Sequence, residues 1–138
     1  NCRFTELQAA VGFENKKKLN FFIKKKKKIY NFYSKEIKNI KNIEIFKYNK
    51  YCNAVPHRIV IFVKKNSKRL LKYLNNNGIG VRTLFVPMHT QPAYNIKKNF
   101  INSKKLFETG ICLPSSPQLT EQKILFICSK IKYFCEKK

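Results

Sequence analysis

Apolar residues recur at helical spacing in two stretches of the chain. From Thr5 to about Tyr33 one stripe contains Leu7, Ala10, Val11, Leu19, Phe22, Ile23, Ile29, Tyr30 and Tyr33. A spacing of i, i+3 and i+4 predicts one long amphipathic helix that buries this stripe. After Thr120, a second face contains Ile124, Ile127, Cys128, Ile131, Phe134 and Cys135. It predicts a C-terminal helix capped by Thr120.

Shorter apolar runs between these helices predict strands. Residues 43–46 suggest a short strand, and residues 55–63 a strand buried on both faces, with Pro56 near its start. Residues 79–86 predict a further strand, and residues 111–114 are expected to be extended. These segments would form a small sheet.

Two shorter helices are expected among the strands. Ser67 is positioned to cap a helix that runs through Asn75, with Gly78 as its left-handed stop, and residues 103–109 predict a second short helix. The order of elements favours an α+β fold, with helices on one face of a short, mostly antiparallel sheet.

The long N-terminal helix carries three further signals. Thr5 and Gln8 have the spacing of a capping box. Gly12 is unfavourable in a helix, which suggests close packing there. The five lysines of residues 24–28 should weaken the helix by mutual repulsion. Lys26 falls on the apolar side, where its stem can snorkel.

Charge changes the functional picture. The 138 residues contain 30 Lys and Arg against 7 Asp and Glu, a formal net charge of +23. Such a charge can indicate a nucleic-acid or anionic-membrane partner. Only four of the basic residues are arginine, which is the residue expected for bidentate phosphate and base recognition. Lys, Asn, Ile, Phe and Tyr all have A/T-rich codons. A drift of the genome toward A and T therefore explains the positive charge without a binding partner.

Other compositional features narrow the class. Five cysteines at irregular spacing, without a C-x-x-C pair, predict neither a zinc site nor a disulfide framework. No apolar run approaches the ~20 residues of a membrane span, and no signal peptide is visible. The sequence lacks an initiator Met and starts inside a motif, so we expect a fragment of a longer product.

Five motifs resemble one enzyme family. Residues 1–12 match Asn-x-Arg-x-Thr-Glu-Leu-Gln-Ala-Ala-x-Gly, a signature of the DegT/DnrJ/StrS sugar aminotransferases, which use pyridoxal phosphate (PLP) and have the aspartate aminotransferase-like fold type I. The other motifs are similar to Val-Pro-His-Arg-Phe-Val-Ile at 55–61, Lys-Gly-Ile-Gly-x-Arg at 77–82, Pro-Leu-His-x-Gln-Pro-x-Tyr at 87–94 and Leu-Pro-x-x-Pro-x-Leu-Thr at 113–120. Their order, over nearly the whole chain, makes the resemblance specific.

The resemblance implies that residues 1–138 are a single small C-terminal domain, with residues 1–35 as the motif and the long linking helix. In the family, a large domain comes first and carries the Schiff-base lysine, the Asp on the pyridine nitrogen and most phosphate contacts. Those motifs are absent from this sequence. We therefore expect no catalytic residue here, and no activity from the chain by itself.

The same resemblance assigns cofactor-binding residues. Family active sites lie at a homodimer interface, where the motif Asn reaches the PLP phosphate of the neighbouring subunit. Asn1 occupies that position, and Arg3 matches the motif Arg. A local salt bridge is the alternative for Arg3. Cys2 and Phe4 replace the common Tyr and Met of the family, which removes one ring contact expected near the cofactor.

Substrate-binding candidates are His57, Arg82, His89, Gln91 and Tyr94. His89, Gln91 and Tyr94 would hydrogen-bond the sugar or nucleotide, and Arg82 would hold a diphosphate. A structural role for His57 and a surface ion pair for Arg82 are the alternatives.

The full enzyme implied by the resemblance is cytoplasmic. It moves an amino group, typically from glutamate, to a keto group of a nucleotide-linked sugar. Two other hypotheses stay open, a basic nucleic-acid-binding module and a decayed remnant that folds but binds nothing. The mostly core-like aromatic positions and the absence of RNP-like motifs argue against the nucleic-acid module.

Overall fold

A computed structural model describes residues 3–94 and 98–137. Its elements, in chain order, are α1 (Glu6–Lys17), α2 (Leu19–Ile37), β1 (Ile43–Ile45), β2 (Ile59–Val63), α3 (Ser67–Asn76), β3 (Arg82–Thr83), the 3₁₀ helix η1 (Met88–Thr90), α4 (Ile101–Thr109), β4 (Gly110–Leu113) and α5 (Glu121–Glu136). The strands form one sheet in the order β1-β2-β4-β3, and every neighbouring pair is antiparallel. The predicted α+β fold with an antiparallel sheet is confirmed.

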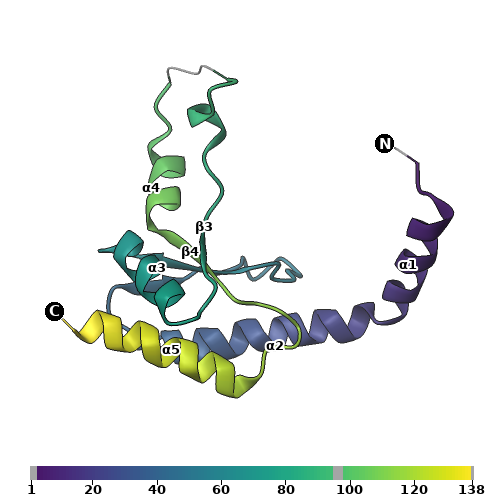
Figure 1. The fold of residues 1–138 in the computed structure, drawn as a ribbon, viewed down its shortest axis with the longest axis horizontal. Coiled ribbons are helices and arrows are strands. Elements are labelled where there is room, and N and C mark those ends of the chain that lie inside the picture. Colours follow the sequence, from purple (N-terminus) through teal and green to yellow (C-terminus); the bar gives the residue numbers. More distant parts are fainter. Residues whose placement is uncertain (1–2, 95–97, 138) are drawn as a thin grey trace.

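Helices α2, α3 and α5 pack on one face of this sheet, while the segment from β3 to α4 rises from the other side (Figure 1). The core between the sheet and the helices is built from buried aliphatic residues and one buried tyrosine, among them Ile37, Ile59, Ile61, Leu70, Leu74, Ile111, Ile124, Ile131 and Tyr33. No charged or polar residue is buried among the described ones. The hydrophobic effect therefore drives association of the helices with a single face of the sheet.

Strand β2 shows that only one face of the sheet is fully buried. Ile59, Ile61 and Val63 are buried, whereas Val60 and Phe62 are half-exposed. Side chains alternate across a strand, and only one face of this sheet carries the covering helices. The prediction that this strand is buried on both faces is wrong.

The long N-terminal helix is broken at Lys18, so the prediction of one continuous helix from Thr5 to Tyr33 is wrong. The amide of Lys18 donates to the carbonyl of Asn15 at 3.1 Å, a tightened last turn, and α2 then begins at Leu19. Helix α1 adjoins the N-terminal end of α2 and lies away from the sheet (Figure 1). None of its residues is buried, so no packing against the core holds it in line with α2.

The capping box predicted for α1 is confirmed, but its apolar stripe is not buried. Thr5 Oγ1 accepts from the amide of Gln8 at 3.3 Å, and Gln8 Oε1 accepts from the amide of Thr5 at 3.0 Å. Leu7 is nevertheless 76% exposed. A Cβ added to Gly12 would meet no atom within 4 Å, so the close packing expected there is absent.

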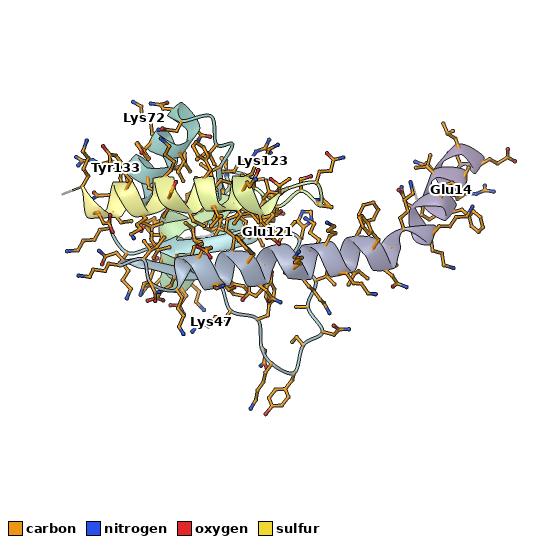
Figure 2. All side chains as sticks on the ribbon, turned by 90° about the horizontal axis from the view of Figure 1, so that it is seen from below. Glu14, Lys47, Lys72, Glu121, Lys123 and Tyr133 are labelled. Atoms are coloured by element: carbon orange, nitrogen blue, oxygen red, sulfur yellow. The ribbon has the colours of Figure 1, made fainter. Side chains whose placement is uncertain are left out.

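The lysine run 24–28 is helical, and three of its members, Lys26, Lys27 and Lys28, have polar partners. Lys28 forms an ion pair with Glu121 at 2.8 Å, and Lys27 Nζ donates to Asn53 Oδ1 at 2.5 Å. Figure 2 shows α2 and α5 side by side, with Glu121 between them. These contacts oppose the repulsion among the lysines, and the expected weakening of the helix stays a prediction. Thr120 caps α5 as predicted, accepting from the amide of Lys123.

Two local predictions for the middle of the chain are wrong. Ser67 is not the cap of α3, because Asn66 occupies that position in the left-handed region (φ 63°) and Ser67 Oγ donates to the carbonyl of Glu108 instead. The strand expected over residues 79–86 is limited to Arg82–Thr83, which pair with Cys112 and Ile111 of β4. Gly78 has φ 74° and ends α3 as predicted.

Candidate functional site

Two cavities lie near the candidate substrate residues, and the first is on the uncovered face of the sheet. This open-face groove has a volume of about 340 Å³ and is lined by Phe46, Tyr48, His57, Arg58, Val60, Phe62, Leu84, Phe85, Leu106 and Cys112. The guanidinium of Arg58 lies 4.9 Å from the centre of the Phe85 ring, a cation–π contact. The groove therefore offers apolar surface with one cation and one imidazole at its edge.

His57 is held at this groove through its main chain. Lys26 Nζ donates to the His57 carbonyl at 3.1 Å, and Ser115 Oγ donates to the same carbonyl at 3.1 Å. Lys26 also donates to the Ser115 carbonyl at 2.7 Å. Burial lowers the pKa of the Lys26 ammonium. These bonds join α2, the segment before β2 and the segment after β4, so Lys26 is a positioning residue.

The second cavity, which we call the arm cleft, lies between α3, α4 and the segment from β3 to η1. It has a volume of about 640 Å³ and is lined by Ser67, Lys68, Leu71, Thr83, Pro87, His89, Thr90, Lys98, Asn99, Lys104, Phe107, Glu108, Gly110 and Ile111. Ser67 Oγ donates to the Glu108 carbonyl at 2.5 Å and so ties α3 to α4 at the cleft. The motif loop of residues 87–94 contributes three of the lining residues.

That loop is ordered by local hydrogen bonds. The Thr90 amide and hydroxyl both donate to the Pro87 carbonyl, at 3.0 and 2.8 Å. The Tyr94 amide donates to the Gln91 carbonyl at 3.0 Å. The ring of His89 packs on Phe100, with ring centres 4.9 Å apart. These contacts hold His89 against the start of α4.

The predicted substrate residues are only partly brought together. His57 lines the open-face groove and His89 lines the arm cleft, whereas Gln91 and Tyr94 share a turn beyond them. Arg82 is exposed on β3, and no ion pair involving it occurs among the described residues. None of Arg82, Gln91 and Tyr94 lines either cavity.

The predicted cofactor residues lie elsewhere. Arg3 is exposed on the segment before α1, which Figure 1 shows apart from the β3–α4 segment. The salt bridge considered for Arg3 is absent among the described residues. Asn1 lies outside the described residues. Arg3 is therefore exposed and has no ion-pair partner among the described residues.

The described residues do not by themselves fit a PLP pocket. PLP enzymes need a lysine with a depressed pKa that can form a Schiff base. Burial lowers the pKa of Lys26, but its ammonium already donates to oxygens of His57 and Ser115. Transamination is therefore not assigned to the residues that the structure describes.

Other site classes find no support within the described part of the chain. No cluster of three His, Cys, Asp or Glu side chains is placed to hold a metal ion. None of the helices there has the length and apolarity needed to cross a membrane.

Sequence reasoning missed Arg58 and the lysines of the arm cleft. Arg58 stands in the same motif as His57, and that motif was the signal that could have found it. Lys68 and Lys104 carry no such signal, because they are two among 26 lysines of similar sequence context.

Comparison with known proteins gives the geometry a context. The model of the DegT/DnrJ/EryC1/StrS aminotransferase family matches residues 1–132. The chain is 29% identical over 137 residues to a GDP-perosamine synthase of Escherichia coli O157:H7, covering 97% of this chain and 37% of that protein. It is 31% identical over 144 residues to a GDP-perosamine synthase of Vibrio cholerae, covering 97% of this chain and 38% of that protein. The chain thus spans little more than a third of these relatives.

Solved structures share the fold. The X-ray structure of S. venezuelae DesV in complex with a ketimine intermediate superposes with a TM-score of 0.90 at 20% identity, covering 99% of this chain and 38% of that one. Helicobacter pylori PseC, an aminotransferase involved in the biosynthesis of pseudoaminic acid, gives a TM-score of 0.89 at 19% identity, again covering 99% and 38%.

Proposed function

The chain belongs to the DegT/DnrJ/EryC1/StrS aminotransferase family, and on this premise we propose that it is the small C-terminal domain of a PLP-dependent sugar aminotransferase. The whole enzyme would transfer an amino group, with glutamate as donor, to a keto group of a nucleotide-linked sugar in the cytoplasm. The family match over residues 1–132 carries the proposal.

We propose that residues 1–138 act as one domain that completes a site held by a large domain and a neighbouring subunit. In support, α2, α3 and α5 share one core with the sheet, while α1, which follows Arg3, contributes no buried residue to it. An extended arm that carries Arg3 suits contact with a second protein surface. Asn1 and Arg3 would reach the phosphate of PLP bound there, whose chemistry is to stabilise the carbanion formed during amino transfer.

The substrate assignment rests on the names of two relatives, both GDP-perosamine synthases, and on the polar residues near the two cavities. His57 would contact substrate at the edge of the open-face groove, and His89 at the arm cleft. Gln91 and Tyr94 would act from the turn beyond, and Arg82 would offer its exposed guanidinium to a diphosphate. The two histidines have main-chain positions fixed by hydrogen bonds or ring packing, which suits recognition.

Complementation tests this function. The large-domain fragment of a GDP-perosamine synthase is mixed with this chain, and glutamate-dependent release of 2-oxoglutarate is measured with a nucleotide-linked keto sugar. We expect activity only in the mixture, and none when the Schiff-base lysine of the large-domain fragment is replaced. The Arg3→Ala substitution should lower the transaminase activity of the mixture at least tenfold, which is the effect of losing one charged contact.

Lys16→Ala is the matched control, because Lys16 is also exposed on the N-terminal arm but lies outside the motif. Stable association without any activity, across several keto sugars, would overturn the proposal.

A further inference from the structure

The outer face of α5 carries lysines and aromatic rings in alternation. Alternating steps of three and four residues keep side chains on one face of a helix, here within an arc of about 80°. The residues that follow these steps, which we call the α5 stripe, are Lys123, Phe126, Lys130, Tyr133 and Lys137. Figure 2 shows Lys123 and Tyr133 on the side of α5 that faces away from α2. The α5 stripe is therefore a surface feature and not part of the core.

The rings of the α5 stripe are exposed, and its lysines lie beside them. Phe126 is 50% exposed and Tyr133 is 48% exposed. Lys130 Nζ lies 5.4 Å from the centre of the Phe126 ring, and Lys137 Nζ lies 4.9 Å from the centre of the Tyr133 ring. Tyr73 of α3 stacks on Tyr133 with an interplanar angle of 21°. Cation–π contacts thus place an ammonium group next to each exposed ring.

Carboxylates lie away from the α5 stripe. Helix α5 contains two, and each is opposite a lysine outside the stripe: Glu121 pairs with Lys28 of α2 at 2.8 Å, and Glu136 lies 3.8 Å from Lys132. The three stripe lysines form no ion pair with any carboxylate in the part of the chain that the structure describes. The stripe is thus a positively charged strip about 21 Å long, which favours a polyanion.

A ligand that matches the α5 stripe has repeated negative charges with flat rings between them. Single-stranded nucleic acid has both, because phosphates repeat along its backbone and its unpaired bases can stack on aromatic side chains. A duplex conceals the faces of its bases, and an anionic lipid surface offers charge without rings. The apolar face of α5 is also buried in the core through Ile124, Ile127 and Ile131, so that face cannot enter a bilayer.

The type of cation indicates low sequence specificity. All three basic positions of the α5 stripe are lysine, and none of the four arginines of the chain lies on α5. Lysine meets a phosphate as a point charge, whereas arginine is the residue that reads base edges through bidentate contacts. Stacking on a ring tolerates every base. Strands should therefore bind with little preference for sequence.

We propose that the α5 stripe binds single-stranded nucleic acid, with its lysines on phosphates and with bases stacked on Phe126 and Tyr133. On binding, the lysine beside each ring moves to a phosphate, and the ring face that it leaves receives a base. This activity is separate from the aminotransferase function proposed above and needs neither PLP nor a large domain. It gives a binding role to part of the net charge of +23.

Fluorescence anisotropy of a labelled oligouridylate of about ten nucleotides tests the rings in the 138-residue chain. We expect saturable binding at physiological salt, and Phe126→Leu should weaken it at least fivefold, the effect of losing one stacked base. Leucine keeps the apolar character and removes the π face. Tyr133→Leu is the second variant and should act in the same direction. No binding by the parent chain, or full binding by both variants, would overturn the proposal.

Phe13→Leu is the matched control for the rings. Phe13 is 62% exposed on α1, and Lys17 Nζ lies 5.0 Å from its ring centre, but this single pair is outside the α5 stripe. Lys17 is also paired with Glu14 at 2.6 Å. We expect Phe13→Leu to bind the oligouridylate within twofold of the parent chain. A loss equal to that of Phe126→Leu would contradict a site on α5.

Salt dependence tests the lysines. Replacing all three stripe lysines with glutamine should make the slope of log affinity against log salt shallower by about 2, because each phosphate contact on a single strand contributes ~0.7. The control triple variant removes the same charge at exposed lysines outside α5, namely Lys35→Gln, Lys41→Gln and Lys47→Gln. Its slope should stay that of the parent chain. Equal slopes in the two triple variants would show attraction by net charge alone and would refute the site.

Competition identifies the class of ligand. Unlabelled single strands of RNA and DNA should displace the oligouridylate alike, and a duplex of the same length should compete at least fivefold less well. Vesicles of phosphatidylserine and phosphatidylcholine should leave the oligouridylate bound. Equal competition by the duplex would rule out base stacking, and displacement by the vesicles would assign the α5 stripe to a membrane surface instead.

Discussion

The ammonium of Lys26 lies 2.7 Å from the main-chain carbonyl of Ser115, which is 89 residues further along the chain. The same nitrogen reaches the His57 carbonyl at 3.1 Å and Ser115 Oγ at 3.3 Å. One lysine thus fixes two family-like motif segments, 55–61 and 113–120, onto α2.

Replacing Lys26 with Met should therefore destabilise the fold. Removal of the donor leaves the Ser115 carbonyl without this partner and the His57 carbonyl with Ser115 Oγ alone, and we expect a loss of about 1–2 kcal/mol in the free energy of unfolding. Urea denaturation measures it. Lys27→Met serves as control, because Lys27 bonds only the exposed Asn53 side chain, and its change should stay within ~0.5 kcal/mol. Equal effects of both substitutions would contradict the positioning role.

Two glycines should respond to alanine in opposite ways. A Cβ at Gly110 would meet Leu84 Cδ1 and, at 2.7 Å, the main-chain oxygen of Leu106, which is not free to move; Gly110→Ala should lower the melting temperature. At Gly12 the added Cβ meets no atom within 4 Å, and alanine is favoured in a helix by ~1 kcal/mol. Gly12→Ala should raise helicity by circular dichroism without lowering the melting temperature. A fall in stability at Gly12 would show a contact that the structure lacks.

Acid should weaken the contact between α2 and α5. The Lys28 ammonium hydrogen-bonded to Glu121 holds the pKa of that carboxyl below its usual range. A folded pKa below the unfolded one means that the pair contributes stability above the unfolded pKa, and loses it as pH falls through the folded pKa. Stability of the parent chain should thus decline more steeply below about pH 4.3 than that of Glu121→Gln. Denaturation series at several pH values in low salt compare the two, and parallel curves would contradict the pairing.

Thiol reactivity should separate the cysteines by burial. Cys52 is exposed, whereas Cys128 is buried and its pKa is raised to about 12, chiefly by desolvation. Because the thiolate is the reactive form, Cys128 should react with a disulfide reagent only after unfolding or at strongly alkaline pH. In a Cys2→Ser variant, Cys52 is the thiol expected to react fastest. Absorbance follows the rate of the reaction, and mass spectrometry identifies the labelled cysteine. Fast native labelling of Cys128 would contradict the packing of α5.

Local chemistry explains which predictions succeeded. The Thr5 and Thr120 caps, the Gly78 stop and the inner face of α5 all depend on residues within one or two turns, so their signals are legible in the sequence. Whether the apolar stripe of α1 is buried depends on the presence of another surface to pack against, which the residues of α1 do not themselves encode. A stripe at helical spacing cannot reveal that Leu7 is exposed while Tyr33, on the same expected helix, is completely buried.

The candidate site was predictable only where a motif marks it. His57 and His89 stand in family-like motifs, and each lines a cavity. Lys68, Lys104 and Lys26 gain their character from segments far away in sequence, such as the 89 residues between Lys26 and Ser115. In a chain with 26 lysines, the sequence alone does not distinguish the few lysines that have specific contacts from the many that are simply exposed.

The break at Lys18 divides the chain into two parts with separate tolerances to mutation. Substitutions on the core side must preserve a packed interior, whereas substitutions within α1 leave that interior untouched as long as the caps remain. Sequence drift in α1 would then be limited by recognition of another surface, so variation among natural relatives should follow that surface and not the domain to which α1 is joined.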